Sequence, residues 1–354
     1  MDDLPESGSG LSLRNAQERT GETEMTPPPS TPADPNAMVD RLTALWGETR
    51  WHTCWSPSAG VGVYIHAGRF RKDLDLWWVH VAAYLPDNKL AVDRFWCRNR
   101  NAAGLSCDQL DLTITTQGWA ATFDGVGQLC DTESLTRASR GSSAPSVRLR
   151  WELSATPLAP VWDMYDGVSW QHDFASAGHI QQASATTGTL WIDDHAYPLD
   201  GVGFKDHSSG ARSFQTWVGH AFLVGEISGR VVHAVTIVRE DSGAQTMGVT
   251  MTPGEQASVT GFDVLPLASF DGAPHEQKLT IETSAGSIAL HAKLIHALPI
   301  TITEANDNFN GVDWDLEGDP MIMVEGIVAL TDERGEVGYG FLERSARRSK
   351  RGLQ

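Results

Sequence analysis

The sequence predicts an all-β protein made of antiparallel sandwiches or barrels. Its apolar residues fall in many short segments, rich in β-branched and aromatic side chains and bounded by turn-forming residues. Residues 110–116 and 146–153 alternate apolar with polar side chains, as expected for strands with one buried face. No long helical period is evident, and short strands at intervals of roughly 8 to 12 residues are typical of sandwiches and barrels.

The first half of the chain contains four clear strand segments, at 60–68, 76–85, 110–116 and 146–153. Turn formers at 86–88 and at Asp124-Gly125 predict hairpins. Residues 154–178 break this rhythm with prolines, acids and aromatics and few strand-like runs. We expect the link between two halves there.

The second half repeats the same texture. Its predicted strands are 188–192, 217–226, 231–238, 259–265, 279–283, 288–294 and 299–303. Hairpins are expected at Asp193-Asp194 and at 332–335. Two halves of similar texture indicate two barrels or sandwiches side by side.

The ends of the chain differ from this β-rich body. The first 37 residues are rich in Pro, Ser, Thr, Gly and Glu and cannot bury enough apolar surface to offset chain entropy. A short helix is expected to follow at 37–45. We expect a disordered arm at 1–37, an N-terminal β domain at 38–153, a linker or interface segment at 154–178, a C-terminal β domain at 179–344 and a basic, solvated tail at 345–354.

Composition limits the partners and the location. The chain has 45 acidic and 27 basic residues, a net charge of -18, which argues against a nucleic-acid partner because phosphate binding needs a basic surface. Its 13 Trp against 5 Tyr suit a chain that lines a large apolar interior. The N-terminus lacks the features of a signal peptide, and no run approaches about 20 apolar residues. We therefore expect no transmembrane segment and a cytoplasmic protein, and leave a homodimer open.

The four cysteines all lie in the first half and form no C-x-x-C pair. A zinc ribbon or redox motif is not expected, and reduced thiols are the default in a cytoplasm. A bridge between Cys97 and Cys107 remains an alternative.

Several catalytic motifs are absent. The sequence has no phosphate-binding loop, no G-x-S-x-G elbow and no H-E-x-x-H pair. Gly201-x-Gly203 alone is too weak a signal for a dinucleotide site. A metal site could draw on His172, His179, His207 and His220 with Asp173 or Asp206, but these spacings match no standard pattern, so no metal is expected.

Residues 201–212 form the densest group of polar side chains between apolar strands. One interpretation is structural, with Asp206 capping a turn, Gly210 forming a bulge and Arg212 a surface charge. The other is a catalytic cluster on a barrel wall, where a buried acid has a raised pKa and can donate a proton. Neighbours along a strand point to opposite faces, so Asp206 and His207 share one cavity only if the strand bends after them.

The same stretch carries a family resemblance. The motif reads Gly178-His179-x-Gln181, Gly188-Thr-Leu and Gly201-x-Gly203-x-x-Asp206-His207-Ser208-x-Gly210-x-Arg212. It resembles the signature of a large bacterial family related to the lipocalin-like double-barrel proteins: carotenoid 1,2-hydratase (hydroxyneurosporene synthase), AttH-like proteins and lipocalin-like cyclases and Diels–Alderases. Segments 62–68, 76–87, 326–330 and 338–343 are also similar, so the match spans about residues 45 to 344. The family usually has Trp where this chain has Ser209, which bears on the substrate.

This resemblance implies two lipocalin-like β-barrels side by side around an apolar cavity. It also implies acid–base chemistry without a dissociable cofactor: a hydratase, isomerase or cyclase acting on a hydrophobic isoprenoid, steroid or polyketide-like molecule. The competing interpretation is a non-catalytic carrier of a hydrophobic ligand.

The expected site centres on Asp206 as general acid or base. Arg212 would orient it or hold a substrate carbonyl, which requires a turn at Ser209-Gly210, because six residues of extended strand span roughly 20 Å. His207 is the third catalytic candidate. The predicted substrate-binding residues are His179, Gln181, Trp170, Trp217 and Ser209.

Overall fold

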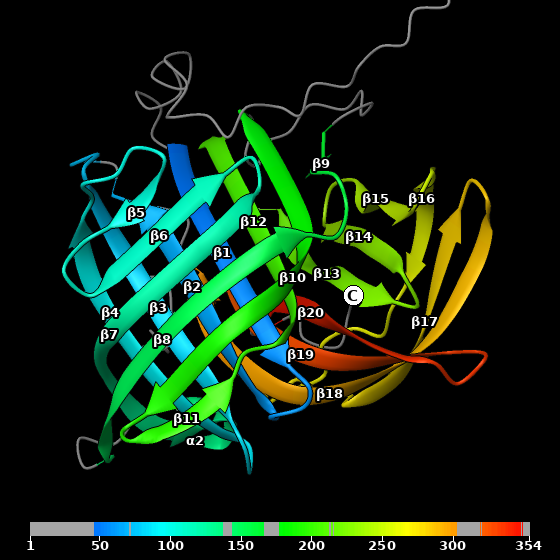
Figure 1. The fold of residues 1–354 in the computed structure, drawn as a ribbon. Coiled ribbons are helices and arrows are strands. Elements are labelled where there is room, and N and C mark those ends of the chain that lie inside the picture. Colours follow the sequence, from blue (N-terminus) through cyan, green and yellow to red (C-terminus); the bar gives the residue numbers. More distant parts are fainter. Residues whose placement is uncertain are drawn as a thin grey trace, which may run out of the picture.

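The computed structural model describes residues 46–70, 72–136, 144–165, 177–211, 214, 216–302, 319, 321–347 and 349. Most of these residues lie in strands of two antiparallel sheets, one of 12 strands and one of 8 (Figure 1). The predicted all-β class is confirmed. The expected arm at 1–37 and helix at 37–45 lie outside the described residues, as do Trp170 and Arg212.

The first sheet is formed by the strands between residues 46 and 211. Its strands are β1 (Trp46–Ser56), β2 (Val61–Arg69), β3 (Leu76–Leu85), β4 (Lys89–Arg98), β5 (Gly104–Ser106), β6 (Leu110–Thr115), β7 (Gly118–Asp131), β8 (Ser146–Pro157), β9 (Trp162–Asp163), β10 (Gly178–Ile192), β11 (His195–Pro198) and β12 (Gly201–Ala211). A short helix, α2 (Thr132–Thr136), follows β7.

This first sheet closes on itself. β1 pairs with β2 on one side and with β12 on the other. The pairing continues through β3, β4, β7, β8 and β10 back to β12, so eight strands form a ring. The short strands β5, β6, β9 and β11 extend the sheet beyond this ring.

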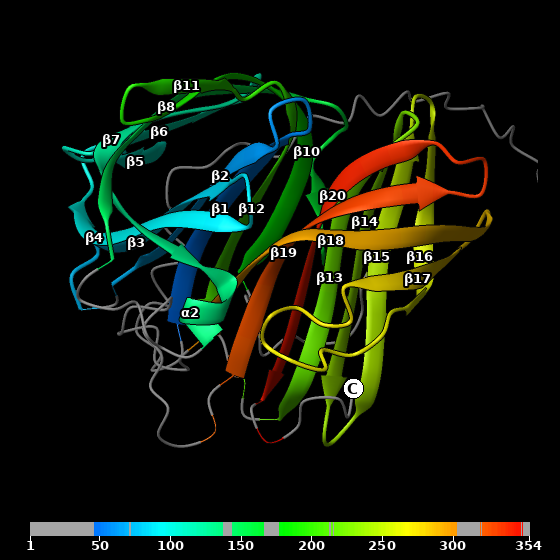
Figure 2. The same cartoon turned by 90° about the horizontal axis from the view of Figure 1, so that it is seen from below.

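The second sheet is a closed barrel in which each strand pairs with the next and β20 returns to β13. Its strands are β13 (Trp217–Ile227), β14 (Arg230–Arg239), β15 (Gly243–Thr252), β16 (Glu255–Asp263), β17 (Glu276–Thr283), β18 (Gly286–Ile302), β19 (Met321–Asp332) and β20 (Val337–Arg347). The two barrels lie side by side, with α2 at one end of the gap between them (Figure 2). Among the described residues, no helix is long and apolar enough to cross a membrane.

The sheets divide between β12 and β13, which is later than the expected start of a second domain at residue 179. β10 and β12 complete the first barrel, because β12 pairs with β1 along nearly its whole length. Strand β20 continues to Arg347, so the first residues of the expected basic tail belong to the second barrel. Arg344, just before those residues, is buried and donates hydrogen bonds to the carbonyls of Leu265 and Pro274.

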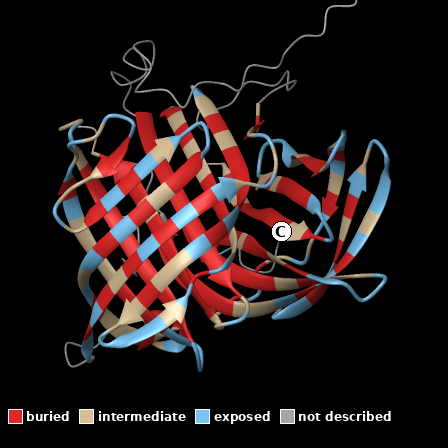
Figure 3. Ribbon diagram, viewed as in Figure 1, coloured by how far each residue is buried: buried red, intermediate tan, exposed pale blue. Residues whose placement is uncertain are grey.

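Local sequence signals explain most of the turns. The hairpin at 86–88 is confirmed, with φ of 60° at Asp87 and 56° at Asn88, as a two-residue turn between twisted strands requires. The hairpin predicted at Asp124-Gly125 is wrong, because both residues lie inside β7. Gly125 instead makes room for a ring: a Cβ there would lie 2.5 Å from Cζ of Phe123. Consecutive residues of β6 and β8 alternate between buried and more exposed positions, as expected for strands with one buried face (Figure 3).

Three large apolar cores hold the molecule together. One fills the first barrel and includes Cys54 and Ile65. Another fills the second barrel and includes Leu223 and Ile281. The third joins the barrels and combines Trp51 of β1 with residues of β13 to β15, β19 and β20. The interface between the barrels is therefore a core in its own right, and burial there changes the chemistry of the polar groups it contains.

The glycines of the family-like motif serve strand packing. A Cβ on Gly201 would lie 2.0 Å from the carbonyl oxygen of Trp55, and one on Gly203 would lie 2.4 Å from Cγ2 of Thr186. Both glycines thus allow β12 to approach its neighbours closely.

Candidate active site at the interface between the barrels

Strand β12 runs without interruption from Gly201 to Ala211 and places Asp206 toward the second barrel. Asp206 lies in register with Trp51 of β1 and Gln181 of β10. Trp51 packs against Phe341 of β20, with ring centroids 4.4 Å apart, so this face of β12 is the face that meets the second barrel. No bend brings His207 round to the same side.

Asp206 is held by two neighbours on β10 and, through them, by the second barrel. Nε2 of His179 lies 2.5 Å from Oδ2 of Asp206, and Nε2 of Gln181 donates to the same oxygen at 3.1 Å. Oε1 of Gln181 lies 3.1 Å from Nδ1 of His233 on β14. Burial lowers the pKa of His233 to about 3, so its ring is neutral and its Nδ1–H donates to Gln181.

The second barrel contributes a second polar group, close enough for the charge of Asp206 to act on it. Glu325 of β19 is 1% exposed and accepts a hydrogen bond from the hydroxyl of Tyr64 at 2.9 Å. Glu343 lies directly opposite Glu325 on β20. Nε2 of His220 bonds to Glu343, and Nδ1 of the same ring lies 2.5 Å from Oγ of Ser345. Two carboxyl groups are therefore paired across neighbouring strands inside a core.

The electrostatics of this pair favour one neutral carboxyl. Burial raises the pKa of Glu325 well above its ordinary value, and the nearby Glu343 and Asp206 raise it further. Burial also raises the pKa of Tyr64 well above its ordinary value. Oε2 of Glu325 has no hydrogen-bond partner among the described residues. Burial and the neighbouring Glu343 therefore favour the protonated form of the Glu325 carboxyl.

Aromatic rings surround these groups. Trp51 contacts Phe222 as well as Phe341, and Trp162 lies 5.4 Å from the ring of His233. Trp217, at the start of β13, is 2% exposed and lies 5.3 Å from the ring of His220. The polar groups therefore lie in an environment of low dielectric constant, where hydrogen bonds and interactions between charges are stronger than in water.

The opposite face of β12 carries a different set of residues. His207 points into the first barrel, where its Nε2 lies 3.1 Å from Oε1 of Glu48. Ser209 pairs in register with Glu48 and, by alternation, shares the face of His207. Two of the predicted site residues are therefore separated from Asp206 by the sheet itself.

The structure brings together His179, Gln181 and Asp206, and places Trp217 beside His220 on the same interface. It does not bring His207 or Ser209 to that interface. No turn forms at Ser209-Gly210, since both lie in β12, and the predicted partner Arg212 lies outside the described residues, as does Trp170. In the described part of the chain, no three His, Cys, Asp or Glu side chains are grouped to hold a metal ion.

Sequence reasoning missed the contribution of the second barrel. Glu325 had a signal: it is the single charged residue in the apolar run 321–330, and an acid in a fully buried strand needs a reason. Tyr64, His233 and Glu343 had no comparable signal. The hydrogen bonds of Tyr64 to Glu325 and of His233 to Gln181 cross between the barrels, so they depend on how the two barrels pack.

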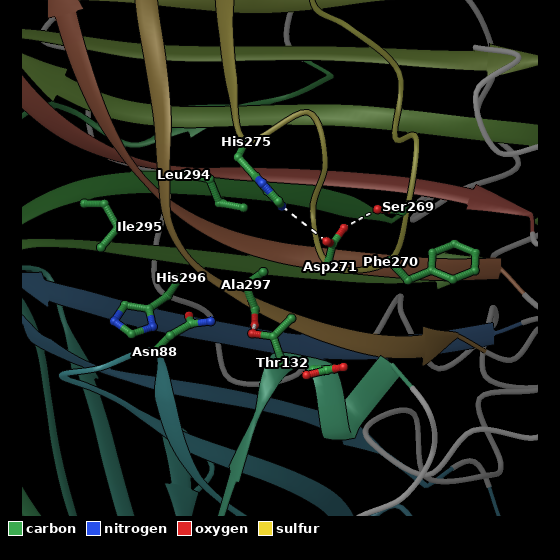
Figure 4. A pocket seen from close by; sticks show the side chains of 11 residues that line it. Asn88, Thr132, Ser269, Phe270, Asp271, His275, Leu294, Ile295, His296 and Ala297 are labelled. Atoms are coloured by element: carbon green, nitrogen blue, oxygen red, sulfur yellow. Dashed lines mark hydrogen bonds and ion pairs between the residues drawn. The ribbon is translucent and has the colours of Figure 1, made fainter.

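A cavity of about 790 Å³ lies at the other end of the interface (Figure 4). The strand β18 lines one side, with His296 and Leu294, and α2 lines another, with Thr132 and Glu133. Hydrogen bonding ties the two sides together, because Oγ1 of Thr132 donates to the carbonyl of Ala297 at 2.7 Å. The expectation that Asp206 lines a large apolar cavity is not met by this one, since Asp206 is not among its lining residues.

Comparisons with known proteins agree with the architecture. The structure resembles a protein described as an AttH from Nitrosomonas europaea, with a TM-score of 0.59 and 15% identity over 85% of this chain and 92% of the other. It also resembles CghA in complex with Sch210972, with a TM-score of 0.53 and 10% identity over 86% and 89% of the two chains. At such identities the likeness shows a shared fold. The predicted resemblance to AttH-like proteins is confirmed at that level, and that to carotenoid hydratase stays a prediction.

A search of curated protein sequences finds no match to this chain. A family model does match, over residues 38–348, and it covers both barrels. The chain therefore belongs to the family described as domain of unknown function DUF7064.

Proposed function

We propose that this protein catalyses acid–base chemistry on a hydrophobic small molecule at the interface between its two barrels. The observation that carries the proposal is the pairing of a buried, neutral acid with a basic group across one interface. Glu325 of the second barrel is fully buried, which favours its protonated form, while Asp206 of the first barrel is bonded to His179 and Gln181 of the same barrel. Two titratable groups in environments that separate their protonation states are the usual basis of an acid and a base at neutral pH.

The roles follow from these protonation states. Glu325 donates its proton to a double bond or a carbonyl of the substrate, and Glu343 beside it opposes the charge that Glu325 then acquires. The His179–Asp206 pair accepts the proton that an attacking water or a carbon centre loses. A proton gained and a proton lost balance the reaction, so hydration, isomerisation and cyclisation each need no oxidant or reductant.

The proposed substrate class is based on the apolar side chains around these groups and on the family resemblance. Trp51, Phe222 and Phe341 offer apolar and aromatic surface next to the acid. This favours an isoprenoid, steroid or polyketide-like molecule over a sugar or a nucleotide. Such a site would contribute to catalysis by holding a flexible substrate in a reactive conformation.

A non-catalytic carrier is the second candidate, and one observation favours it. The cavity in Figure 4 has a volume typical of small-molecule sites, which are about 300–1,000 Å³, yet neither Glu325 nor Asp206 lines it. A ligand held there would be bound without being transformed.

Deuterium transfer separates the two candidates without knowledge of the product. The wild-type protein is incubated in D₂O with a panel of polyenes, terpenoids, steroids and polyketide-like compounds, and mass spectrometry detects carbon-bound deuterium or added water. Quenching of tryptophan fluorescence reports binding in parallel. An enzyme of the proposed type labels a compound that it binds, because Glu325 exchanges its proton with solvent.

The variants Glu325→Gln and Asp206→Asn should bind that compound and lose labelling, while Glu255→Gln, an exposed acid on β16, should label it as the wild type does. Labelling that survives in both interface variants contradicts the assigned roles. Binding without labelling in the wild type supports the carrier.

A further inference from the structure

The inside of the first barrel contains an excess of buried positive charge. Arg50 is 3% exposed, Arg69 8% and Lys205 8%, and all three lie on inward-facing positions of β1, β2 and β12. Glu48 is the carboxylate that faces them: its Oε2 lies 3.2 Å from Nε of Arg69, and its Oε1 lies 3.9 Å from Arg50. Arg50 and Arg69 thus share Glu48, whereas Lys205 has no carboxylate within ion-pair distance among the described residues.

The Glu48 carboxylate is already fully ionised. Burial opposes its ionisation, but the hydrogen bond and charge of His207, with Arg69 and Arg50, lower the pKa of Glu48 to about 2. Glu48 therefore carries its full negative charge at neutral pH and cannot supply more. Burying an unpaired charge is costly, so the remaining positive charge calls for a partner.

Several donors in the cluster point to no acceptor. Lys205 makes no hydrogen bond or ion pair with the described residues, and Nε of Arg50 is buried without an acceptor. His52, 1% exposed and in register with Lys205, has both ring nitrogens buried without a partner. Such donors cluster in native proteins where an ion, a water or a ligand completes them.

A small cavity lies among these donors. Its volume is about 30 Å³, and its walls include Arg50, His52, Lys205 and His207 together with Ile114 and Ile180. Asp206 also borders it, but the carboxyl of Asp206 bonds to His179 and Gln181 of β10. A cavity needs roughly 10–15 Å³ to hold one water-sized group, so this one has room for about two.

We propose that this cavity is a binding site for a monovalent anion, held by Lys205, Arg50 and His52 inside the first barrel. The chemistry of the occupant is that of one halide ion or one carboxylate group. Its size excludes a phosphate ester, and the apolar walls at Ile114 and Ile180 leave space for the start of a hydrocarbon chain rather than for a second charge. The site is separate from the interface site and does not rest on the proposed function.

The charge on Lys205 agrees with this assignment. Burial, and then repulsion by Arg50, lower its pKa to about 8. An anion in the cavity would offset both effects, and a neutral His52 would add one N–H donor, because burial keeps the pKa of its ring well below the ordinary value.

Anion-dependent unfolding tests the site in the full-length protein. Urea unfolding is followed in sodium chloride, bromide, acetate and hexanoate, with sodium sulfate keeping the ionic strength constant. Above the dissociation constant, each tenfold rise in a bound anion should lower the unfolding constant tenfold. Lys205→Met should lose this dependence, and the exposed Lys278→Met should keep it, which also removes general salt effects from the comparison.

Crystals soaked in bromide give a second, direct measurement. An anomalous peak between Lys205, Arg50 and His52 in the wild type that is absent in Lys205→Met supports the site. This measurement does not depend on a well-defined urea-unfolding transition of the variant. Hexanoate that displaces bromide and binds more tightly than acetate identifies the carboxylate of a ligand as the occupant. A halide that no carboxylate displaces identifies an inorganic ion. The proposal is overturned if the wild type shows no bromide peak and its anion dependence equals that of Lys205→Met.

Discussion

Replacing Lys205 by Met should change how the stability of this protein depends on pH. The folded-state pKa of Lys205 is about 8, against 10.5 for an ordinary lysine. That difference of about 2.5 pH units corresponds to about 3 kcal/mol, at ~1.4 kcal/mol per unit. Below pH 8 the lysine is charged in both states, and the folded protein bears the full cost of burying that charge.

The sign follows from proton binding. Between pH 8 and 10.5 the folded state has released the proton of Lys205 while the unfolded state still binds it, so stability rises with pH in this window. Methionine has no proton to release. The wild-type free energy of unfolding should therefore rise by about 3 kcal/mol relative to that of Lys205→Met between pH 7.5 and 10.5.

The assay is urea unfolding at intervals of half a pH unit in buffer of low halide and carboxylate content. The difference between wild type and variant isolates Lys205 from other titrating groups. Adding the anion that binds best should flatten the rise, because a bound anion keeps the lysine protonated in the folded state. Parallel pH profiles for the two proteins would refute the view that Lys205 is a buried and unpaired cation.

Three further predictions test the packing and the thiols. Tyr64→Phe removes the donor to Glu325 and should cost about 1–3 kcal/mol in urea unfolding, whereas Tyr197→Phe, on the peripheral strand β11, should cost little. Gly203→Ala should cost a similar ~1–3 kcal/mol, since its Cβ would lie 2.4 Å from Cγ2 of Thr186, and adding Thr186→Ser should recover most of that loss; no recovery would contradict the clash. The hydrogen bond from Cys97 lowers the pKa of Cys107 to about 6, so diamide should link these two thiols already at pH 7, as measured by mass spectrometry after alkylation. Burial raises the pKa of Cys54 to about 12, so Cys54→Ser should leave that rate unchanged and Cys107→Ser should abolish the link.

The fold class and most strand positions could be predicted from local sequence patterns. Alternation at 146–153 and the turn formers at 86–88 are local signals, and the structure follows them in β8 and in the β3–β4 hairpin. Local signals failed at Asp124-Gly125, where a glycine serves ring packing inside a strand rather than a turn.

The candidate site was only half accessible to sequence reasoning. Asp206, His179 and Gln181 could be named together because β10 and β12 are near neighbours in the chain, and the structure joins them. The separation of His207 from Asp206 was also foreseeable, because adjacent residues of an unbent strand point to opposite faces.

The groups that complete each face of β12 come from strands distant in the chain and depend on the packing of the fold. Pairing with β1 places Lys205 beside Arg50 and His52 inside the first barrel, and packing of the barrels brings Glu325 within reach of the charge of Asp206. These partners are far apart in sequence, and periodicity fixes which residues share a face without fixing what that face will meet. The free energy of burying the shared apolar core selects that pairing, and it sets the charge state of Glu325 and Lys205 as a consequence.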